Sequence, residues 1–311
     1  MLRRVVVTFV ALVIIVVPGT AASTSNLSPA QLLNLSRAPA ESYTATIRIW
    51  NPLAGDAEVH VSWSGGVGVF AAQRDGRVSQ MIVDSSGVCV SQPDSPMAKS
   101  FQPLPDDIDL LLENYSAATA QGPSIAGRDT IELRIVGKSG GRSTRTLWLD
   151  RHTGVVLKRT DMNYRGDILE RWEVTHIVYS PSIDEATLRA VQQAMKARRA
   201  SGAGPTPAPR EVVNSSGVAA VLPKWLPVGY RLAGSGLVMS GQVVQAIYSD
   251  GLSPISLYVR RVPWFARKPS RPTLVEFDTG QAIEWEGKGF RFVLVGDIDP
   301  NILLNIAVSV L

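Results

Sequence analysis

The residues from Thr130 to Tyr179 decide the fold of the first two-thirds of the chain; they read TIELRIVG-KSGGRST-RTLWLD-RHTG-VVLKRTDM-NYRGD-ILERWEVTHIVY. Side chains in each apolar run alternate with a period of two, so that Ile131, Leu133 and Ile135 share one face of a strand. Short Gly-containing segments separate the runs, as tight hairpin turns require. The pattern predicts four consecutive antiparallel strands, a meander with one apolar face.

The same alternation continues toward the N-terminus of this meander. Strands are expected at 43–51, 57–64, 67–72, 77–84 and 88–91, and helices at 28–37, 106–115 and 182–199. Turn signals recur about every ten residues, a spacing typical of a sheet that curls into a barrel or half-barrel. We therefore expect an α+β domain in which helices cover one face of a half-open antiparallel β-barrel.

A change in composition separates this domain from the rest of the chain. Residues 200–216 are rich in Gly, Ala and Pro and are expected to form an extended linker between a domain at 23–199 and a smaller α+β domain at 217–311. In the smaller domain the pattern predicts strands at 231–240, 243–249, 255–262, 281–285 and 290–295, and a helix at 301–310.

The N-terminal residues 1–22 have the pattern of an export signal. Arg3 and Arg4 precede the apolar run Val5–Val17, and small residues follow at 18–22. The apolar run is short against the roughly 20 residues that a membrane-spanning helix needs. We expect cleavage and an exported protein, with a retained membrane anchor as the alternative.

The charge and cysteine content exclude some classes of partner and of stabilisation. Removal of residues 1–22 takes away two Arg and no acid, so the formal charge falls from +4 to +4 − 2 = +2. That charge is too small to predict a nucleic-acid partner. Cys89 is the one cysteine, so no internal disulfide forms. Between two valines, it is interpreted as a buried core residue, with a reactive thiol as the alternative.

The sequence carries no motif of a known catalytic site. The three histidines, His60, His152 and His176, are dispersed, and no His or Cys cluster has the spacing of metal ligands. No nucleophile elbow between a strand and a helix, no phosphate-binding loop and no dinucleotide-binding fingerprint is present. We therefore expect neither a cofactor nor a metal, and an enzyme is the least favoured class.

Two sets of residues are candidates for binding. The first is aromatic and lies on the expected sheet, where it either fills the core or lines a cavity for an apolar ligand: Trp50, Trp63, Phe70, Trp148 and Trp172. The second lies in residues 260–268 of the smaller domain, the basic loop, which is either a solvated hairpin loop or a docking surface: Arg260, Arg261, Trp264, Phe265 and Arg267.

Several stretches resemble one family in order and spacing. They are IAGRDTIELRIVGKSGGRSTRTLWLDRHTGVVLKRTDMNYRGDILERWEVTHI in the first domain, and KWLPVGY, IYSDGLSPISLYV and VLVGDIDPNILLNIA in the second. These stretches are similar to the RseB/MucB family of envelope-stress regulators, and the likeness covers most of the chain after the export signal. It rests on hydrophobic and turn positions rather than on a catalytic string.

The resemblance implies a fold and a function. It implies a large domain like the lipoprotein carriers LolA and LolB and a small domain behind a linker. Its implied role is an exported negative regulator of an extracytoplasmic sigma factor, which binds a membrane-anchored anti-sigma factor and senses a lipid or lipoprotein ligand. The alternative is a LolA-type carrier of lipid or lipoprotein, which would need a deep apolar cavity in the first domain and would not need the basic loop.

Overall fold

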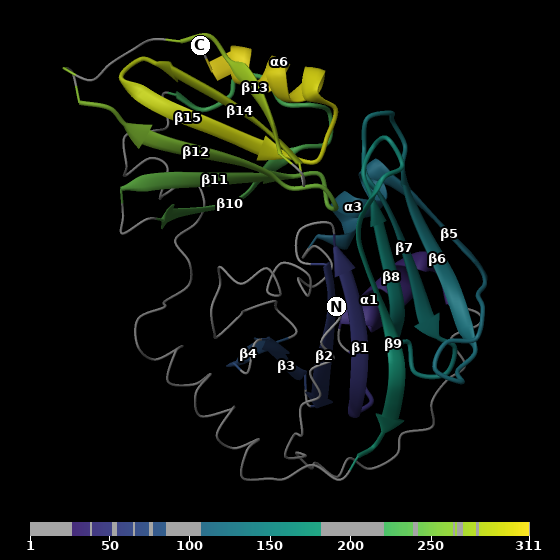
Figure 1. Cartoon of the computed structure of the whole chain (residues 1–311). Helices are drawn as coiled ribbons and strands as arrows, with labels where there is room; N and C mark the ends of the chain where they lie inside the picture. Colours follow the sequence, from purple (N-terminus) through teal and green to yellow (C-terminus); the bar gives the residue numbers. More distant parts are fainter. Residues whose placement is uncertain are drawn as a thin grey trace.

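The computed structural model of the chain consists mainly of antiparallel strands in two sheets (Figure 1). The N-terminal module, residues 27–181 where described, contains one sheet, and the C-terminal module, residues 221–310 where described, contains the other. The structure describes residues 27–37, 39–51, 55–64, 66–74, 77–84, 107–181, 221–238, 242–263, 265, 270–277 and 280–310.

The N-terminal module is built on a nine-stranded sheet in the order β4-β3-β2-β1-β9-β8-β7-β6-β5. β1 pairs with β9, which joins the start and the end of the module in the middle of the sheet. Since β4 and β5 lie at opposite edges, the described strands form an open sheet. The strands are β1 (Tyr43–Asn51), β2 (Gly55–Ser64), β3 (Val67–Arg74), β4 (Arg77–Asp84), β5 (Tyr115–Gln121), β6 (Thr130–Gly137), β7 (Thr144–Asp150), β8 (Val156–Met162) and β9 (Ile168–Tyr179).

The meander predicted from Thr130 to Tyr179 is confirmed as β6, β7, β8 and β9, each antiparallel to the next. Gly154 and Gly166 lie in its turns with φ of 72° and 91°, in the left-handed region that glycine adopts without steric cost. The strand β5, which pairs with β6, was not predicted. Its sequence YSAATAQ consists mostly of small residues and lacks the β-branched and aromatic pattern of a strand.

Both described helices of this module begin at capping residues. Before α1 (Pro29–Arg37), the Ser28 backbone N–H donates to Gln31 Oε1 at 2.8 Å, and the Gln31 N–H donates to Ser28 Oγ at 3.3 Å. This reciprocal pair is a capping box. Before α3 (Ile108–Asn114), the Asp107 side chain accepts a hydrogen bond from the Leu110 N–H at 2.7 Å. The predictions of helices at 28–37 and 106–115 are therefore confirmed, the second with narrower bounds.

The C-terminal module has a six-stranded antiparallel sheet in the order β10-β11-β12-β15-β14-β13. All five predicted strands and the helix are present, and β13, which was not predicted, adds an edge strand. The elements are β10 (Arg231–Val238), β11 (Val243–Ser249), β12 (Ile255–Arg261), β13 (Thr273–Phe277), β14 (Gly280–Gly287), β15 (Phe290–Gly296) and α6 (Pro300–Val310).

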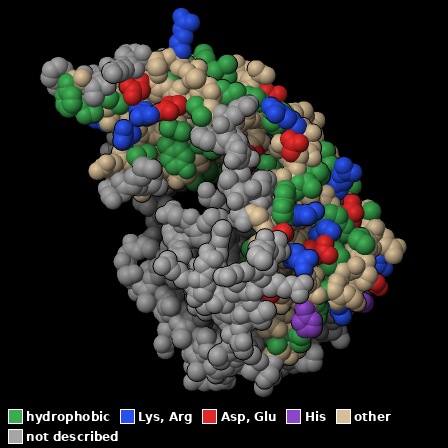
Figure 2. All heavy atoms as spheres, viewed as in Figure 1, with side chains coloured by type: hydrophobic (Ala, Val, Ile, Leu, Met, Phe, Trp, Pro, Cys, Tyr) green, Lys and Arg blue, Asp and Glu red, His purple; other side chains and the backbone are tan. Residues whose placement is uncertain are grey.

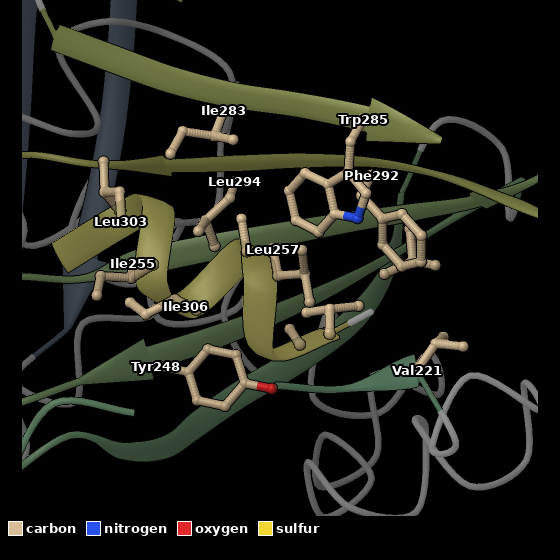
Figure 3. Packing of buried hydrophobic residues seen from close by; sticks show 14 of the residues in the cluster. Val221, Tyr248, Ile255, Leu257, Ile283, Trp285, Phe292, Leu294, Leu303 and Ile306 are labelled. Atoms are coloured by element: carbon tan, nitrogen blue, oxygen red, sulfur yellow. The ribbon is translucent and has the colours of Figure 1, made fainter. Parts of the chain in front are cut away.

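One apolar core joins α6 to this sheet (Figure 3). Trp285 of β14 and Phe292 of β15 stack with ring centroids 4.8 Å apart, and both are fully buried. Leu303 and Ile306 of α6 are buried in the same cluster. A helix that buries side chains at a spacing of three against a sheet gives a small domain its stability.

Several expectations concern segments outside the described residues. They are the export signal at 1–22, the strand at 88–91 with Cys89, the helix at 182–199 and the linker at 200–216. These expectations stay predictions.

Candidate functional site

One face of the nine-stranded sheet carries two apolar clusters. The first joins α1 and α3 to β5, β6 and β7, with Leu33, Leu111, Leu133 and Leu147 fully buried. The second lies mainly on β1, β2, β3 and β9 and contains Ala45, Ile47, Ile49, Val59, Val61, Phe70 and Val174. The same face therefore offers apolar surface over most of its width.

A charged strip separates the two clusters. In the strand register, one row across the face reads Leu133, Leu147, Arg159, Trp172, Ile49. The strip consists of Arg145, Arg159, Asp161 and Glu170, whose side chains are at most 15% exposed. Asp161 accepts hydrogen bonds from Arg145 Nε and Nη2 at 2.7 and 2.8 Å and from Arg159 Nε at 3.0 Å.

The carboxylate of Asp161 stays ionised because of its two arginines. Burial alone raises its pKa, but the positive charges of Arg145 and Arg159, and their hydrogen bonds, outweigh burial and hold the pKa well below its usual range. With two basic and two acidic groups, the strip is formally balanced and offers no excess charge to an ionic ligand.

The structure separates the five aromatic residues that were grouped as candidate ligand contacts. The register places Trp63, Phe70 and Trp172 on the face with the apolar clusters. Trp50 alternates with Ile49 onto the opposite face, where Arg171 stacks over it at 5.2 Å. Trp148 alternates with two buried leucines of β7 and has Lys158 Nζ 5.2 Å from its ring, but it also packs against the second apolar cluster. A ligand-lining role for these residues stays a prediction.

A second ionic network closes the turn between β7 and β8. The fully buried Asp150 accepts hydrogen bonds from Arg128 Nε at 2.7 Å, from Tyr179 Oη at 2.9 Å and from the His152 N–H at 2.8 Å. Burial opposes ionisation of Asp150, but these three donors outweigh it and lower the pKa of the carboxyl. The network ties β9 to the β7–β8 turn and is satisfied internally.

The two modules meet at the C-terminal end of α3 (Figure 1). There Asn114 Nδ2 donates across the boundary to the Asp250 carbonyl oxygen at 3.0 Å and to the Gly229 carbonyl oxygen at 3.2 Å. The same amide also donates to the Leu110 carbonyl of its own helix at 3.0 Å. One buried side chain thus satisfies carbonyls of both modules.

A buried ion pair lies beside Asn114. Arg142, in the β6–β7 turn, donates from Nη1 to Asp250 Oδ2 and from Nη2 to the Val228 carbonyl oxygen at 2.5 Å. The side chains of Arg142 and Asp250 are 8% and 0% exposed. Tyr115 Oη donates to the same Asp250 oxygen at 2.8 Å. The Arg142 guanidinium lies 5.6 Å from the Tyr115 ring and 5.7 Å from the Tyr230 ring.

We call Asn114, Tyr115, Arg142, Tyr230, Asp250 and Ser253 the junction cluster. Asp250 also fixes its own turn, because Oδ1 accepts the N–H groups of Leu252 at 3.1 Å and Ser253 at 2.9 Å. The two oxygens of one carboxylate therefore hold the β11–β12 turn and the opposite module at once. Burial, and then the Asp250 charge, raise the pKa of Tyr115, so its hydroxyl stays a donor at neutral pH.

Two glycines allow the modules to approach this closely. Gly251 has φ 101°, and a Cβ there would lie 2.6 Å from the Leu111 Cα. Gly229 has φ 90°, and a Cβ there would lie 1.8 Å from Asn114 Oδ1. Since other residues rarely adopt such φ values, both positions exclude a side chain on conformational and steric grounds.

Two further contacts, one exposed and one largely buried, flank the junction cluster. Arg231 Nη2 donates to Glu113 Oε2 at 2.9 Å, and both side chains are more than half exposed. Ser143 Oγ donates to the Asp297 carbonyl at 3.1 Å. Burial raises the pKa of the Asp297 carboxyl. An exposed ion pair contributes little to stability in water, so the junction depends mainly on its buried groups.

The described start of the basic loop, Arg260 and Arg261, lies at the end of β12 away from the junction cluster (Figure 1). Arg260 and Arg261 end β12 and are exposed, and Phe265 is 76% exposed. The Arg261 guanidinium lies 5.5 Å from the centroid of the Phe290 ring. Trp264 and Arg267 lie outside the described residues. The docking role of the loop stays a prediction.

Three further observations concern the distribution of charge, metal ligands and membrane spans. Basic and acidic side chains are interspersed over the described part of the face in Figure 2 rather than gathered by sign. Within the ranges that the structure describes, no group of three His, Cys, Asp or Glu side chains could hold a metal. In the same ranges, no helix has the length and apolarity needed to cross a membrane.

The junction cluster was not predicted from the sequence. Its ion pair joins residues 108 positions apart, and Asn114 and Asp250 are 136 apart. Local patterns assigned Arg142 to a turn and Asn114 to a helix end, and those placements hold. A weak signal was present in Asp250-Gly251 between two apolar strands, which indicates a turn but not what the turn contacts.

Comparison with known proteins gives consistent matches. Residues 65–192 match the family model "MucB/RseB N-terminal domain". The chain is 24% identical over 278 residues to the Sigma factor AlgU regulatory protein MucB of Pseudomonas aeruginosa. The aligned residues cover 86% of this chain and 81% of that protein.

Solved structures extend the match to both modules. The crystal structure of MucB in complex with MucA(peri) aligns over 90% of this chain and 96% of its own, with 18% identity and a TM-score of 0.63. The crystal structure of MucB alone covers 90% and 95% with a TM-score of 0.55 and the same identity. An alignment of this length includes both sheets and shows a shared overall fold.

Proposed function

We propose that this chain, which belongs to the MucB/RseB family, is an exported negative regulator of an extracytoplasmic sigma factor. It binds the exported segment of a membrane-anchored anti-sigma factor and shields that segment from the protease that starts its destruction. The observation that supports this most is the match to MucB across both modules, since MucB is a sigma-factor regulatory protein and has been solved with MucA(peri).

The proposal extends to a ligand and to the shape of the N-terminal module. The open nine-stranded sheet, together with the segments around it, forms a half-open barrel like that of LolA. Its apolar face, at Trp63, Phe70 and Trp172, receives an acyl chain of a lipid or lipoprotein. Such a ligand relieves inhibition by favouring a form with low affinity for the anti-sigma segment. The shift cannot exceed the difference in ligand affinity between the two forms.

A docking role for the basic loop belongs to the same proposal. Arg260, Arg261 and the exposed Phe265 combine positive charge with an exposed aromatic ring, a combination enriched where proteins bind one another. Arg260 and Arg261 lie at the end of β12 that is away from the junction cluster. An extended anti-sigma segment could therefore reach it without displacing the buried contacts between the modules.

Titration calorimetry tests the proposal. The purified chain, without residues 1–22, is titrated with the exported segment of the single-span protein encoded beside its partner sigma factor. We expect one-to-one binding with a dissociation constant in the micromolar range or tighter, and protection of the segment from added protease. Absence of binding at high micromolar concentrations would refute the proposal.

A variant of the loop tests the docking site separately. The triple substitution Arg260→Ala, Arg261→Ala and Trp264→Ala is expected to weaken binding at least about tenfold, because Arg and Trp are enriched among the residues that dominate binding energy at interfaces. The control is Arg165→Ala, which removes an exposed arginine from a turn of the N-terminal module. Equal affinities of the loop variant and the wild type would exclude the loop as the docking site.

A LolA-type carrier is the second candidate, and the two apolar clusters on one sheet face favour it. A carrier would retain lipid through purification and transfer it to acceptor vesicles. Mass spectrometry of the purified chain and a transfer assay separate the two functions. Transfer without any binding of the anti-sigma segment would favour the carrier.

A further inference from the structure

The two modules share no strand pairing within the described residues. The nine-stranded and the six-stranded sheet are separate, so no hydrogen-bond ladder fixes one relative to the other. Within the described residues, α3 and the β6–β7 turn of one module contact the β11–β12 turn, the residues before β10 and the segment between β15 and α6 of the other, and their relative placement depends on these contacts. Those contacts decide how the basic loop of one module lies relative to the apolar face of the other.

The chemistry of the junction cluster selects one orientation. An apolar contact tolerates sliding, whereas a buried guanidinium loses its partner if the carboxylate moves by an ångström or two. Arg142 is constrained twice, by Asp250 and by the Val228 carbonyl, and it is held between the rings of Tyr115 and Tyr230. Rotation of either module would break several of these contacts together.

The cluster is also preorganised on both sides. On the C-terminal module, Asp250 Oδ1 holds its own turn while Oδ2 accepts from Arg142 and Tyr115. On the N-terminal module, Asn114 bonds to its own helix as well as across the boundary. Each group is held by hydrogen bonds within its own module, so it cannot shift to follow the other module. A rotation of one module therefore breaks the contact.

The distance from the junction to the basic loop amplifies any change of orientation. β12 has seven residues, so its far end lies about 23 Å from the junction at about 3.3 Å per residue. A rotation of about 10° at the junction displaces that end by about 4 Å, more than the length of a hydrogen bond. A partner that contacts both modules would therefore bind one orientation much better than its neighbours.

We infer that Arg142 and Asp250 are positioning residues: their buried ion pair holds the two modules in the orientation to which the anti-sigma segment binds, without touching that segment. This inference rests on the proposed function. In this view the junction cluster controls the affinity for the anti-sigma segment. When the ion pair is broken, orientations that cannot bind become populated, and the apparent affinity falls with the fraction of competent molecules.

The test compares Asp250→Asn with Arg231→Gln in the full chain without its export signal. Asp250→Asn keeps a side-chain oxygen for the Leu252 and Ser253 N–H groups but removes the charge that binds Arg142. Arg231→Gln also removes one charge from the same boundary, but from the exposed rim. We expect Asp250→Asn to weaken binding of the anti-sigma segment at least about thirtyfold, as a competent fraction of about 3% implies, and Arg231→Gln less than about threefold.

A distance measurement reports orientation independently of the partner. Spin labels are attached at Asp167→Cys and Val308→Cys, one exposed site in each module, in a Cys89→Ser background. We expect one narrow distance distribution in the otherwise wild-type chain and a broad one after Asp250→Asn. Circular dichroism confirms that each variant is folded. A distribution that stays narrow in Asp250→Asn would overturn the inference.

A cross-link distinguishes positioning from general damage. Glu113→Cys and Arg231→Cys, whose native side chains meet at the rim, are joined by a short bismaleimide in the Asp250→Asn chain with Cys89→Ser. If the ion pair acts by holding the modules in one orientation, the cross-linked Asp250→Asn chain should bind the anti-sigma segment with at least about a tenth of the wild-type affinity. Failure to restore any affinity would overturn the inference. A wild-type chain that does not bind would refute the proposed function, while the distance distribution still decides whether the pair orients the modules.

Discussion

The charged strip of the nine-stranded sheet and the junction cluster are both buried networks of arginine and aspartate, but they join different things. The strip connects β7, β8 and β9, which a continuous hydrogen-bond ladder already aligns. The junction cluster connects two modules that share no ladder in the described residues. The same chemistry therefore contributes local stability in one place and relative orientation in the other.

This difference predicts how each network responds to a substitution. Loss of a charge from the strip leaves unpaired arginines inside a sheet whose geometry persists, so the effect is a loss of stability. Loss of a charge from the junction leaves both modules folded but no longer fixed relative to one another. A substitution in the strip should therefore mainly lower stability, and a substitution in the junction cluster should mainly lower affinity for the partner.

The largest expected effect on stability is in the strip. Asp161→Ala leaves Arg145 and Arg159 buried without their common partner, which should lower the free energy of unfolding by about 3–5 kcal/mol. The matched control is Glu173→Ala, which removes one acid from the exposed Lys158–Glu173 pair of the same sheet and should cost under about 1 kcal/mol. Urea unfolding measures both. Equal losses would contradict the distinction between buried and exposed pairs.

The next effect tests the close approach of the modules. Gly251→Ala combines an unfavourable φ with overlap against the Leu111 backbone and should cost about 2–4 kcal/mol. Gly166→Ala has a similar φ but nothing within 4 Å of the added methyl group, so it should cost about 1 kcal/mol. Denaturant unfolding of the two variants isolates the steric part. If they cost the same, the modules are not in contact at this turn.

Acid should weaken the N-terminal module. Asp150 and Asp161 have lowered pKa values in the folded chain, so their stabilisation is complete above the ordinary aspartate pKa of about 3.9 and declines as pH falls below it. Asp297, whose pKa is raised, changes stability in the opposite sense and offsets part of the loss.

The measurement is the free energy of unfolding between pH 6 and pH 3, with Asp150→Asn as the comparison. Because this variant has one fewer low-pKa carboxyl, its stability should change less with pH than that of the wild type. A steeper dependence in the variant would contradict the assignment of Asp150.

The smallest effect concerns the rim of the junction. Arg231→Gln removes exposed ion pairs with Glu113 and Asp107 and should lower the free energy of unfolding by less than about 1 kcal/mol. The difference from the wild type should shrink in high salt, which screens exposed charges. A loss comparable with that of Asp250→Asn would show that the rim, rather than the buried pair, holds the modules together.

Most strands were predictable because their side chains alternate. The meander from Thr130 to Tyr179 became β6 to β9, and the smaller domain has all five predicted strands and its helix. The two missed strands are both at sheet edges. β5 has small residues, and β13 is a five-residue strand beside the basic loop. Edge strands are held by one neighbour, so their sequences are less restricted.

The candidate sites were less predictable because they depend on faces and on distant contacts. Ile49 and Trp50 are consecutive in β1, so alternation alone places their side chains on opposite faces of the sheet. The sequence could therefore have shown that Trp50 does not share a face with Trp63 and Trp172. No local pattern could have paired Arg142 with Asp250, since each is an ordinary turn residue in its own segment. Their partnership exists only once both sheets have formed.

Scanning calorimetry of the full chain without its export signal tests the central claim most directly, that the junction makes two separate sheets act as one body. At neutral pH we expect one cooperative transition, with calorimetric and van't Hoff enthalpies in agreement, and two resolved transitions after Asp250→Asn. Two independent transitions in the wild-type chain, unchanged by Asp250→Asn, would contradict the account.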